Sequence, residues 1–234
     1  MPAFAATVTL RDGPCDRLPL IDAALARVGV ASAYDWSTDI PRAVGLAGSS
    51  ALVIAALRAS GGAPTDPLEM AQLALAVERD DLGIPGGLQD RATQAFDVPV
   101  FVDLAVGAVT PFRPGAPLTF VVAWDPSAAN DSGDYHRALE TDPAGMDALA
   151  RIARAAADAF VAGDLDDLEE AMDASGRLRD HVAPLSSAHN ALADYVRGCG
   201  LYPNSTGSGG AVIALVRQTL PNLAVPHVVC NFEP

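Results

Sequence analysis

The fold of this chain is indicated by residues 41–51, which read PRAVGLAGSSA and precede the apolar run of residues 52–59. Two glycines and two serines therefore stand where an extended segment gives way to a helix. The first amides of a helix have no intrahelical acceptor and lie at the positive end of its dipole, so such a junction can bind an anion. Serine hydroxyls there cap the helix or bind a metal held by the anion. The stretch alone is compatible with an ordinary helix cap and with a phosphate-binding loop.

Composition excludes several functional classes. A length of 234 residues, half of them hydrophobic, suits one large domain or two small ones around a buried core. The net charge of −14 disfavours nucleic acid and acidic membranes, which require clustered Lys and Arg. No apolar run is long enough to cross a membrane, and no secretion signal is visible. Cys15, Cys199 and Cys230 cannot all pair and form no C-x-x-C, which suits a reduced cytosol. We therefore expect a cytoplasmic protein.

Hydrophobic periodicity and turn residues predict a mixture of helices and strands. Helices are expected at residues 18–28, 49–60, 66–80, 88–96, 146–160, 165–182 and 186–197. Strands are expected at residues 7–10, 33–40, 98–104, 118–124, 211–216 and 225–229, with a loop between the halves at residues 126–133. Because single helices do not regularly separate the strands, the pattern predicts an α+β protein with two packed layers in each half.

Two further segments carry groups with possible chemistry. Residues 75–91, LAVERDDLGIPGGLQDR, place Glu78 near a helix end and Asp90 beyond a Gly-Gly turn. Mg²⁺ needs few protein oxygens, so one carboxylate and one serine suffice, while a second carboxylate could orient an attacking hydroxyl. Residues 198–215, GCGLYPNSTGSGGAVIAL, form a glycine-rich turn before a buried strand, where backbone can approach a ligand closely. Taken singly, the carboxylates could also be surface residues and the glycines a tight turn.

In this order, the three segments resemble the GHMP kinases, the superfamily of galactokinase, homoserine kinase, mevalonate kinase and phosphomevalonate kinase. Residues 41–51 match its phosphate-binding pattern P-x-x-x-G-L-x-x-S-S-A. Glu78 followed by Asp90 resembles the metal-ligand helix and the G-x-x-D element, and residues 206–210 resemble the C-terminal glycine motif. The segments GLQDR at 87–91, DSG at 131–133 and STGSGGAV at 205–212 are most similar to glucuronokinase-type sugar 1-kinases.

The resemblance implies a ribosomal-protein-S5-type N-terminal domain, residues 1–115, and a ferredoxin-like C-terminal domain, residues 116–234, with the active site in the cleft between them. It implies that the phosphates of ATP are bound by Gly45, Leu46, Ala47, Gly48, Ser49 and Ser50, and that Gly207, Ser208 and Gly209 shape the cleft from the other domain. Ser50 and Glu78 would hold Mg²⁺, and Asp90 would be the base or the orienting carboxylate. The residues nearest to the sugar would be Asp131, Ser132, Gly133 and Arg179, and the candidate cations for a sugar carboxylate are Arg42, Arg91 and Arg179.

The implied activity is transfer of the γ-phosphoryl group of ATP to the anomeric hydroxyl of a sugar or a glucuronate-like sugar acid. Two alternatives stay open. One is another GHMP kinase, acting on a heptose, fucose, galactose or mevalonate. The other is a non-catalytic ligand-binding relic, because the family's first motif has no counterpart in this sequence and we expect truncation at the N-terminus.

Overall fold

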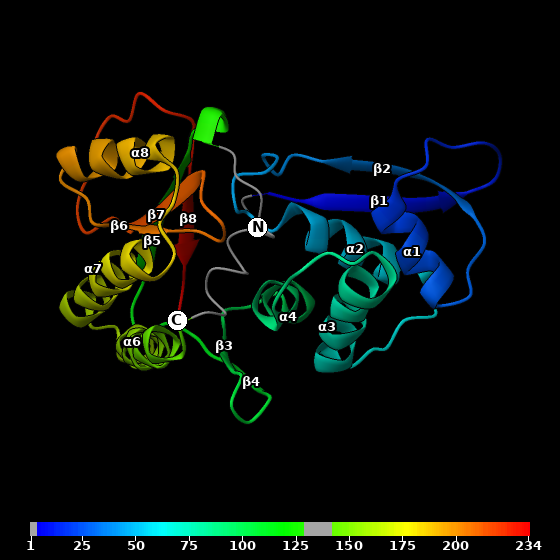
Figure 1. Ribbon diagram of the computed structural model, residues 1–234, viewed down its shortest axis with the longest axis horizontal. Helices are drawn as coiled ribbons and strands as arrows, with labels where there is room; N and C mark the ends of the chain where they lie inside the picture. Colours follow the sequence, from blue (N-terminus) through cyan, green and yellow to red (C-terminus); the bar gives the residue numbers. More distant parts are fainter. Residues whose placement is uncertain (1–3, 129–141) are drawn as a thin grey trace. The chain divides into compact units, whose positions relative to one another are not determined.

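The structure, a computed structural model, describes residues 4–128 and 142–234. The chain folds into two compact units (Figure 1). Residues 4–40 and 47–112 form what we call the N-terminal unit, and residues 41–46 and 113–234 form the C-terminal unit. The chain changes unit between Ile40 and Pro41, between Leu46 and Ala47 and between Phe112 and Arg113, so the first two crossings bound residues 41–46.

The N-terminal unit combines short antiparallel strand pairs with a group of helices. Its elements are β1 (Ala6–Arg11), α1 (Pro19–Arg27), β2 (Ala33–Thr38), α2 (Gly48–Ser60), α3 (Pro67–Ala76), η1 (Val77–Asp81), α4 (Leu88–Phe96), β3 (Val100–Asp103) and β4 (Ala108–Pro111). Strands β1 and β2 pair from Ala6 opposite Thr38 to Arg11 opposite Ala33. The core lies mainly among α1, α2 and α3, where Ile21, Val53 and Leu57 are fully buried.

Helix α3 shows how local sequence sets the position of a site residue. Its first turn contains Pro67, and the Asp66 side chain accepts a hydrogen bond from the Glu69 amide at 2.9 Å, so the predicted helix start is confirmed. The predicted single helix to residue 80 is not regular throughout, because after Ala76 the chain widens into the π-helix η1. Such π turns occur frequently at functional sites, and this one carries Glu78.

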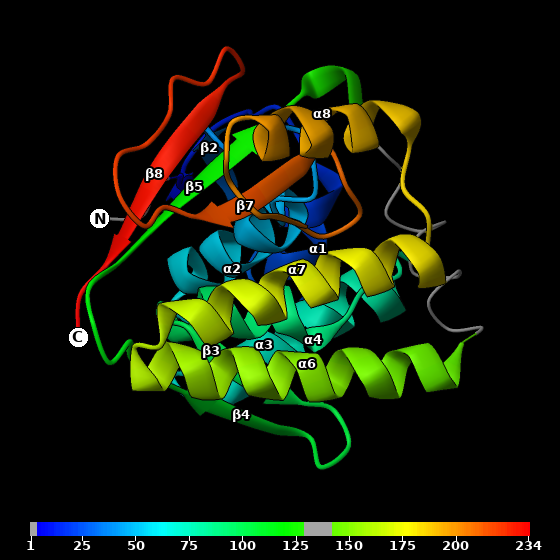
Figure 2. The same cartoon turned by 90° about the vertical axis from the view of Figure 1, so that its left-hand side faces the viewer.

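The C-terminal unit is built on a four-stranded antiparallel sheet in the order β6-β7-β5-β8. Its elements are β5 (Leu118–Trp124), η2 (Pro126–Ala128), α6 (Pro143–Ala162), α7 (Leu165–Val182), α8 (Ser187–Gly198), β6 (Pro203–Ser205), β7 (Ala211–Leu215) and β8 (His227–Phe232). Helices α6 and α7 lie side by side (Figure 2). Both α7 and α8 contact β6. Leu192 and Val196 of α8 pack with Val121 and Val212 of the sheet.

The α+β class is confirmed, and most predicted elements are present. Strand β5 and helix α7 have the predicted bounds. Strands β4 and β6 were not predicted from the sequence. Both are very short and β4 is largely exposed, so neither shows a hydrophobic period. Within the described residues, none of the helices combines the length and apolar character needed to span a membrane.

Candidate functional site

The connection from β2 to α2, residues 39–47, holds the backbone in unusual conformations. Ala43 and Ala47 both have φ of 57°, in the left-handed region, which costs a non-glycine residue about 1–2 kcal/mol. Ala47 precedes α2, and no side chain caps the helix start. Of the two roles that the sequence left open for the serines, the helix cap is therefore absent. The first amides of α2 keep their donor capacity for an anion, and strain of this kind gathers at binding sites.

The carbonyl oxygen of Ala47 organises this helix start. It accepts hydrogen bonds from the Ala51 amide at 3.1 Å, from the Ser50 hydroxyl at 3.0 Å and from the side-chain amide of Gln94 at 3.0 Å. Ser50 is fully buried, and because its proton points to Ala47, its oxygen lone pairs are left for a cation. Through this bond Gln94 connects α4 to the start of α2, although it belongs to none of the predicted motifs.

Two glycine-containing segments far apart in the sequence meet within the C-terminal unit. A Cβ on Gly45 would lie 2.5 Å from the Thr206 carbonyl oxygen, and one on Gly207 would lie 2.7 Å from the Gly45 carbonyl oxygen. These distances allow no side chain, so glycine is required for the two backbones to touch. Leu46 packs beside the buried Val44, which fixes the segment on the sheet. The structure thus brings Gly45 together with the glycine loop, defined here as residues 206–210.

Helix α7 contacts the glycine loop through the side chain of Arg179. The guanidinium of Arg179 donates to the carbonyl oxygens of Ser205 and Gly207. Arg179, expected near the sugar, therefore lies on the loop backbone. Ser208 is buried, and Gly209 has φ of 98°, a conformation that favours glycine.

Glu78 is the most unusual charged group of the N-terminal unit. Its side chain is fully buried and pairs with Arg91, whose Nε lies 2.7 Å from Oε2 and whose Nη2 contacts the same oxygen. Oε1 has no hydrogen-bond partner among the described residues. A buried carboxylate oxygen without a donor is costly, and a divalent cation is one group that would satisfy it.

Arg91 is itself confined. It is 4% exposed, and its Nη1 donates to the Gly87 carbonyl oxygen at 2.9 Å. A Cβ on Gly86 would lie 2.8 Å from Nη2, so the Gly-Gly turn makes room for the guanidinium. Arg91 was a candidate for binding a substrate carboxylate; in the structure its charge neutralises Glu78 instead.

Asp90 has the accessibility that a reacting group requires. Its side chain is 50% exposed, and Oδ2 lies 3.8 Å from Nη1 of Arg91. Asp90 is in the first turn of α4, one turn before Gln94, so the two side chains share a helix face. Because Gln94 reaches the start of α2, Asp90 lies on the face of α4 that meets the Ser50 region.

The remaining predicted residues differ in exposure, and some lie outside the described part of the chain. Arg42 is exposed, whereas Gly48 and Ser49 are half-buried in the first turn of α2. Asp131, Ser132 and Gly133 lie outside the described residues. One residue that no motif predicted also contacts the glycine loop: His189 of α8 accepts a hydrogen bond from the Gly210 amide. Its isolated position in the sequence gave no signal.

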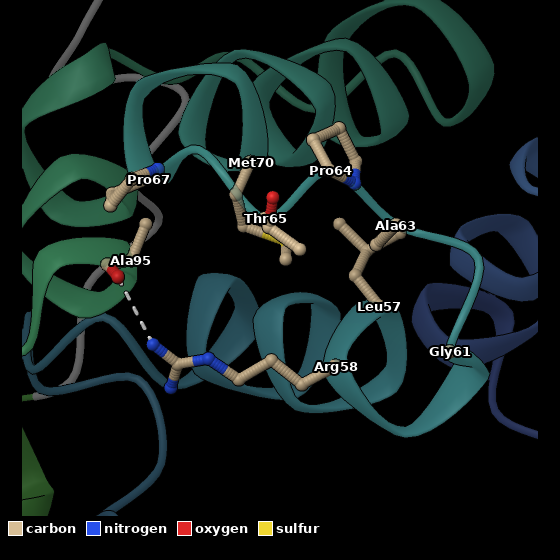
Figure 3. A pocket seen from close by; sticks show the side chains of 9 residues that line it. All are labelled: Leu57, Arg58, Gly61, Ala63, Pro64, Thr65, Pro67, Met70 and Ala95. Atoms are coloured by element: carbon tan, nitrogen blue, oxygen red, sulfur yellow. Dashed lines mark hydrogen bonds between the residues drawn. The ribbon is translucent and has the colours of Figure 1, made fainter.

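The N-terminal unit also has a pocket at the end of α2 opposite to the uncapped amides. It has a volume of about 360 Å³ and is lined by the C-terminal end of α2, the start of α3 and Ala95 (Figure 3). Its cation, Arg58, is bonded to the carbonyl oxygens of Gln94 and Ala95 and paired with Asp97. Since the uncapped amides are at the opposite end of α2, we do not assign the chemistry to this pocket.

Comparisons with known proteins find a matching family and kinases of similar sequence. Residues 20–97 match the family described as GHMP kinases N terminal domain. Glucuronokinase 1 of Arabidopsis thaliana is 30% identical over 222 residues, which are 82% of this chain and 59% of the relative. The D-glycero-alpha-D-manno-heptose 7-phosphate kinase of Campylobacter jejuni is 42% identical over 62 residues, 25% of this chain and 18% of the relative. The chain thus spans less than two thirds of either relative.

The fold likeness is broader. The structure of Streptococcus pneumoniae phosphomevalonate kinase in complex with phosphomevalonate and AMPPNP is similar, with a TM-score of 0.72 over 92% of this chain and 82% of that chain. The sequences are 16% identical, so the match shows a shared fold.

Proposed function

We propose, from the match of residues 20–97 to the GHMP kinase N-terminal domain family, that this chain acts as an ATP-dependent kinase of a sugar or sugar acid. The observation that carries the proposal is the start of α2, where a strained alanine leaves the first helical amides uncapped beside the buried hydroxyl of Ser50. This arrangement offers donors and a positive dipole to a polyphosphate.

The nucleotide phosphates would be bound chiefly by backbone. We assign this role to the amides of Gly48, Ser49 and Ser50 at the start of α2. Gly45 and the glycine loop, which meet within the C-terminal unit, offer backbone free of side chains. Backbone amides are suitable for this chain because its net charge is strongly negative, so positive potential must be supplied locally. Leu46 contributes by anchoring the segment to the core.

Ser50 and Glu78 fit a magnesium ion chemically. Both side chains are fully buried, and each has an oxygen able to act as ligand: Oγ of Ser50, and Oε1 of Glu78, which has no partner among the described residues. Mg²⁺ accepts so few protein ligands because it keeps several waters. When bound, the ion neutralises charge on the phosphates of the nucleotide.

We assign to Asp90 the orientation and deprotonation of the acceptor hydroxyl. A half-exposed carboxylate can accept the proton of an attacking hydroxyl, orient its lone pair and remove the proton late in the transfer. Phosphoryl transfer requires little covalent chemistry from the protein, so positioning is the main contribution of this side chain. Such a group is worth about 10²- to 10⁴-fold in rate.

For the acceptor we favour the anomeric hydroxyl of a glucuronate-like sugar acid. The extended similarity to Arabidopsis glucuronokinase 1 supports it. A uronate carboxylate needs a cation, and Arg42 is the exposed candidate, since Arg91 is committed to Glu78 and Arg179 to the glycine loop. The second candidate substrate is a heptose phosphate, favoured by the shorter match to the Campylobacter kinase.

The test is an acceptor panel. The purified chain is incubated with Mg-ATP and D-glucuronate, a heptose 7-phosphate, galactose or mevalonate, and ADP release is followed together with phosphorus NMR of the product. We expect a sugar 1-phosphate, and its loss in Asp90→Asn. Nucleotide binding by calorimetry without turnover of any acceptor would favour the ligand-binding relic, and no binding of Mg-ATP would refute the kinase assignment.

A further inference from the structure

His189 is a buried titratable group that the proposed mechanism does not use. It lies in the first turn of α8 and is 1% exposed. Nδ1 accepts a hydrogen bond from the Gly210 amide at 3.0 Å, and Nε2 lies 2.9 Å from Oγ of Ser205. Ser205 ends β6 and Gly210 precedes β7, so one imidazole ring bonds both ends of the glycine loop.

These bonds define the protonation state of the ring. Because Nδ1 accepts a hydrogen bond from a backbone amide, it carries no proton, and the neutral ring must carry its proton on Nε2. Nε2 therefore donates to the Ser205 hydroxyl and cannot take a proton from it. The pair is thus not a serine nucleophile with its base. Burial lowers the pKa of His189, opposed by the Asp180 carboxylate and assisted by the Arg179 guanidinium, which favours the neutral form.

The ring also supports the loop by contact. A Cβ on Gly209 would lie 3.5 Å from Nδ1 of His189, so the imidazole packs directly against the loop backbone. The loop also meets Gly45, where the carbonyl oxygen of Thr206 leaves no space for a side chain. A displacement of Gly210 would therefore be transmitted to the segment that carries Gly45.

We propose that neutral His189 is a positioning residue for nucleotide binding. Its Nδ1 fixes the Gly210 amide and thereby holds the glycine loop against Gly45 in the form that admits the nucleotide. The inference rests on the proposed kinase function. The Gly210 bond selects the tautomer and does the positioning, and the Ser205 hydroxyl only accepts the proton that Nε2 then carries.

Two substitutions separate the two bonds. In His189→Asn the side-chain oxygen replaces Nδ1, so the Gly210 bond is kept and the Ser205 bond is lost. In His189→Gln the side-chain amide replaces Nε2, so the Ser205 bond is kept and the Gly210 bond is lost. Ser205→Ala is the matched control, because it removes only the hydroxyl.

We expect His189→Gln to raise the Kd and KM for ATP about 5- to 10-fold, the effect of one hydrogen bond, with kcat changed less than about twofold. His189→Asn and Ser205→Ala should bind ATP as the unaltered protein does. Equal Kd values for the Asn and Gln variants would overturn the inference. Absence of nucleotide binding in the unaltered protein would overturn the proposed function and the inference together.

A measurement on the unaltered protein covers the case in which the Gln variant does not fold. The imidazole nitrogens are observed by ¹⁵N NMR with and without AMPPNP. We expect Nδ1 to be unprotonated and its resonance to shift on nucleotide addition, because the loop that it holds contacts the ligand. An Nδ1 resonance that does not move when AMPPNP binds would contradict the assignment.

Discussion

Replacing Arg91 with methionine tests most directly whether Arg91 stabilises the buried carboxylate of Glu78. Arg91 provides two contacts to Oε2 of Glu78, one of them at 2.7 Å, and Oε1 has no other partner in the described part of the chain. In Arg91→Met the fully buried Glu78 loses its counter-charge and all its donors. Breaking one side of a buried ion pair costs about 3–5 kcal/mol, so the free energy of unfolding should fall by that amount.

The double variant Glu78→Met/Arg91→Met is the informative control. Removing both charges leaves no unpaired ion, and replacing a buried pair with apolar side chains is often neutral or stabilising. We expect the double variant to recover most of the loss, with a coupling energy of at least about 2 kcal/mol. The measurement is urea unfolding followed by circular dichroism, with the slope of the transition checked for constancy.

A substitution at Gly86 perturbs the ion pair of Glu78 and Arg91 without changing either side chain. Gly86→Ala places a methyl group 2.8 Å from Nη2 of Arg91 and should move the guanidinium off Oε2, whereas Gly198→Ala adds a methyl group where nothing lies within 4 Å. We expect a loss of stability only for Gly86→Ala. A cost below about 1 kcal/mol for Arg91→Met would show that Arg91 does not stabilise the Glu78 carboxylate. So would a double variant whose loss equals the sum of the two single variants.

Three further predictions concern the loop and the catalytic groups. Asp90→Asn should lower kcat about 10²- to 10⁴-fold in a coupled ADP assay and leave the Kd for ATP within about twofold; unchanged turnover would exclude Asp90 from the chemistry. Gly45→Ala brings a methyl group 2.5 Å from the Thr206 carbonyl oxygen and should abolish ATP binding by calorimetry, whereas Gly107→Ala, at a similar positive φ in open space, carries only the backbone strain and should bind normally. Because burial lowers the pKa of His189 in the folded protein, the unfolded chain binds more protons below pH 6.5, so the free energy of unfolding should fall with decreasing pH there by at most about 1.4 kcal/mol per pH unit. A slope that persists unchanged in His189→Asn would assign it to other groups.

Local sequence signals were enough to predict most of the fold. The Asp66 cap with Pro67, and the uninterrupted apolar run of residues 118–124, each act within a few residues and need no partner from elsewhere. The π-helix at Glu78 could not be predicted in this way, because no local residue type specifies it. The division into domains of residues 1–115 and 116–234 stays a prediction.

The candidate site was predicted less completely, for a physical reason. The motifs single out the segments of the candidate site, yet the contacts of Arg91 and Arg179 depend on which atoms they meet after folding. A surface arginine and an arginine paired with a buried carboxylate have the same sequence signature. Arg91 is inside because the glycines before it leave room for its guanidinium, and that space exists only once α4 has packed.

The conformation at Ala47 explains why Gln94, a residue outside every motif, contacts the start of α2. A left-handed alanine is retained only where its surroundings fix it, and here one carbonyl oxygen accepts three hydrogen bonds, the longest-range one from Gln94. The backbone at Ala47, where the β2–α2 connection ends, is therefore ordered by folding of the N-terminal unit, before any ligand arrives. A pre-ordered loop loses less conformational entropy on binding than a flexible one. The use of alanine rather than glycine at this position is consistent with that demand, because alanine has fewer alternative conformations in the unfolded chain.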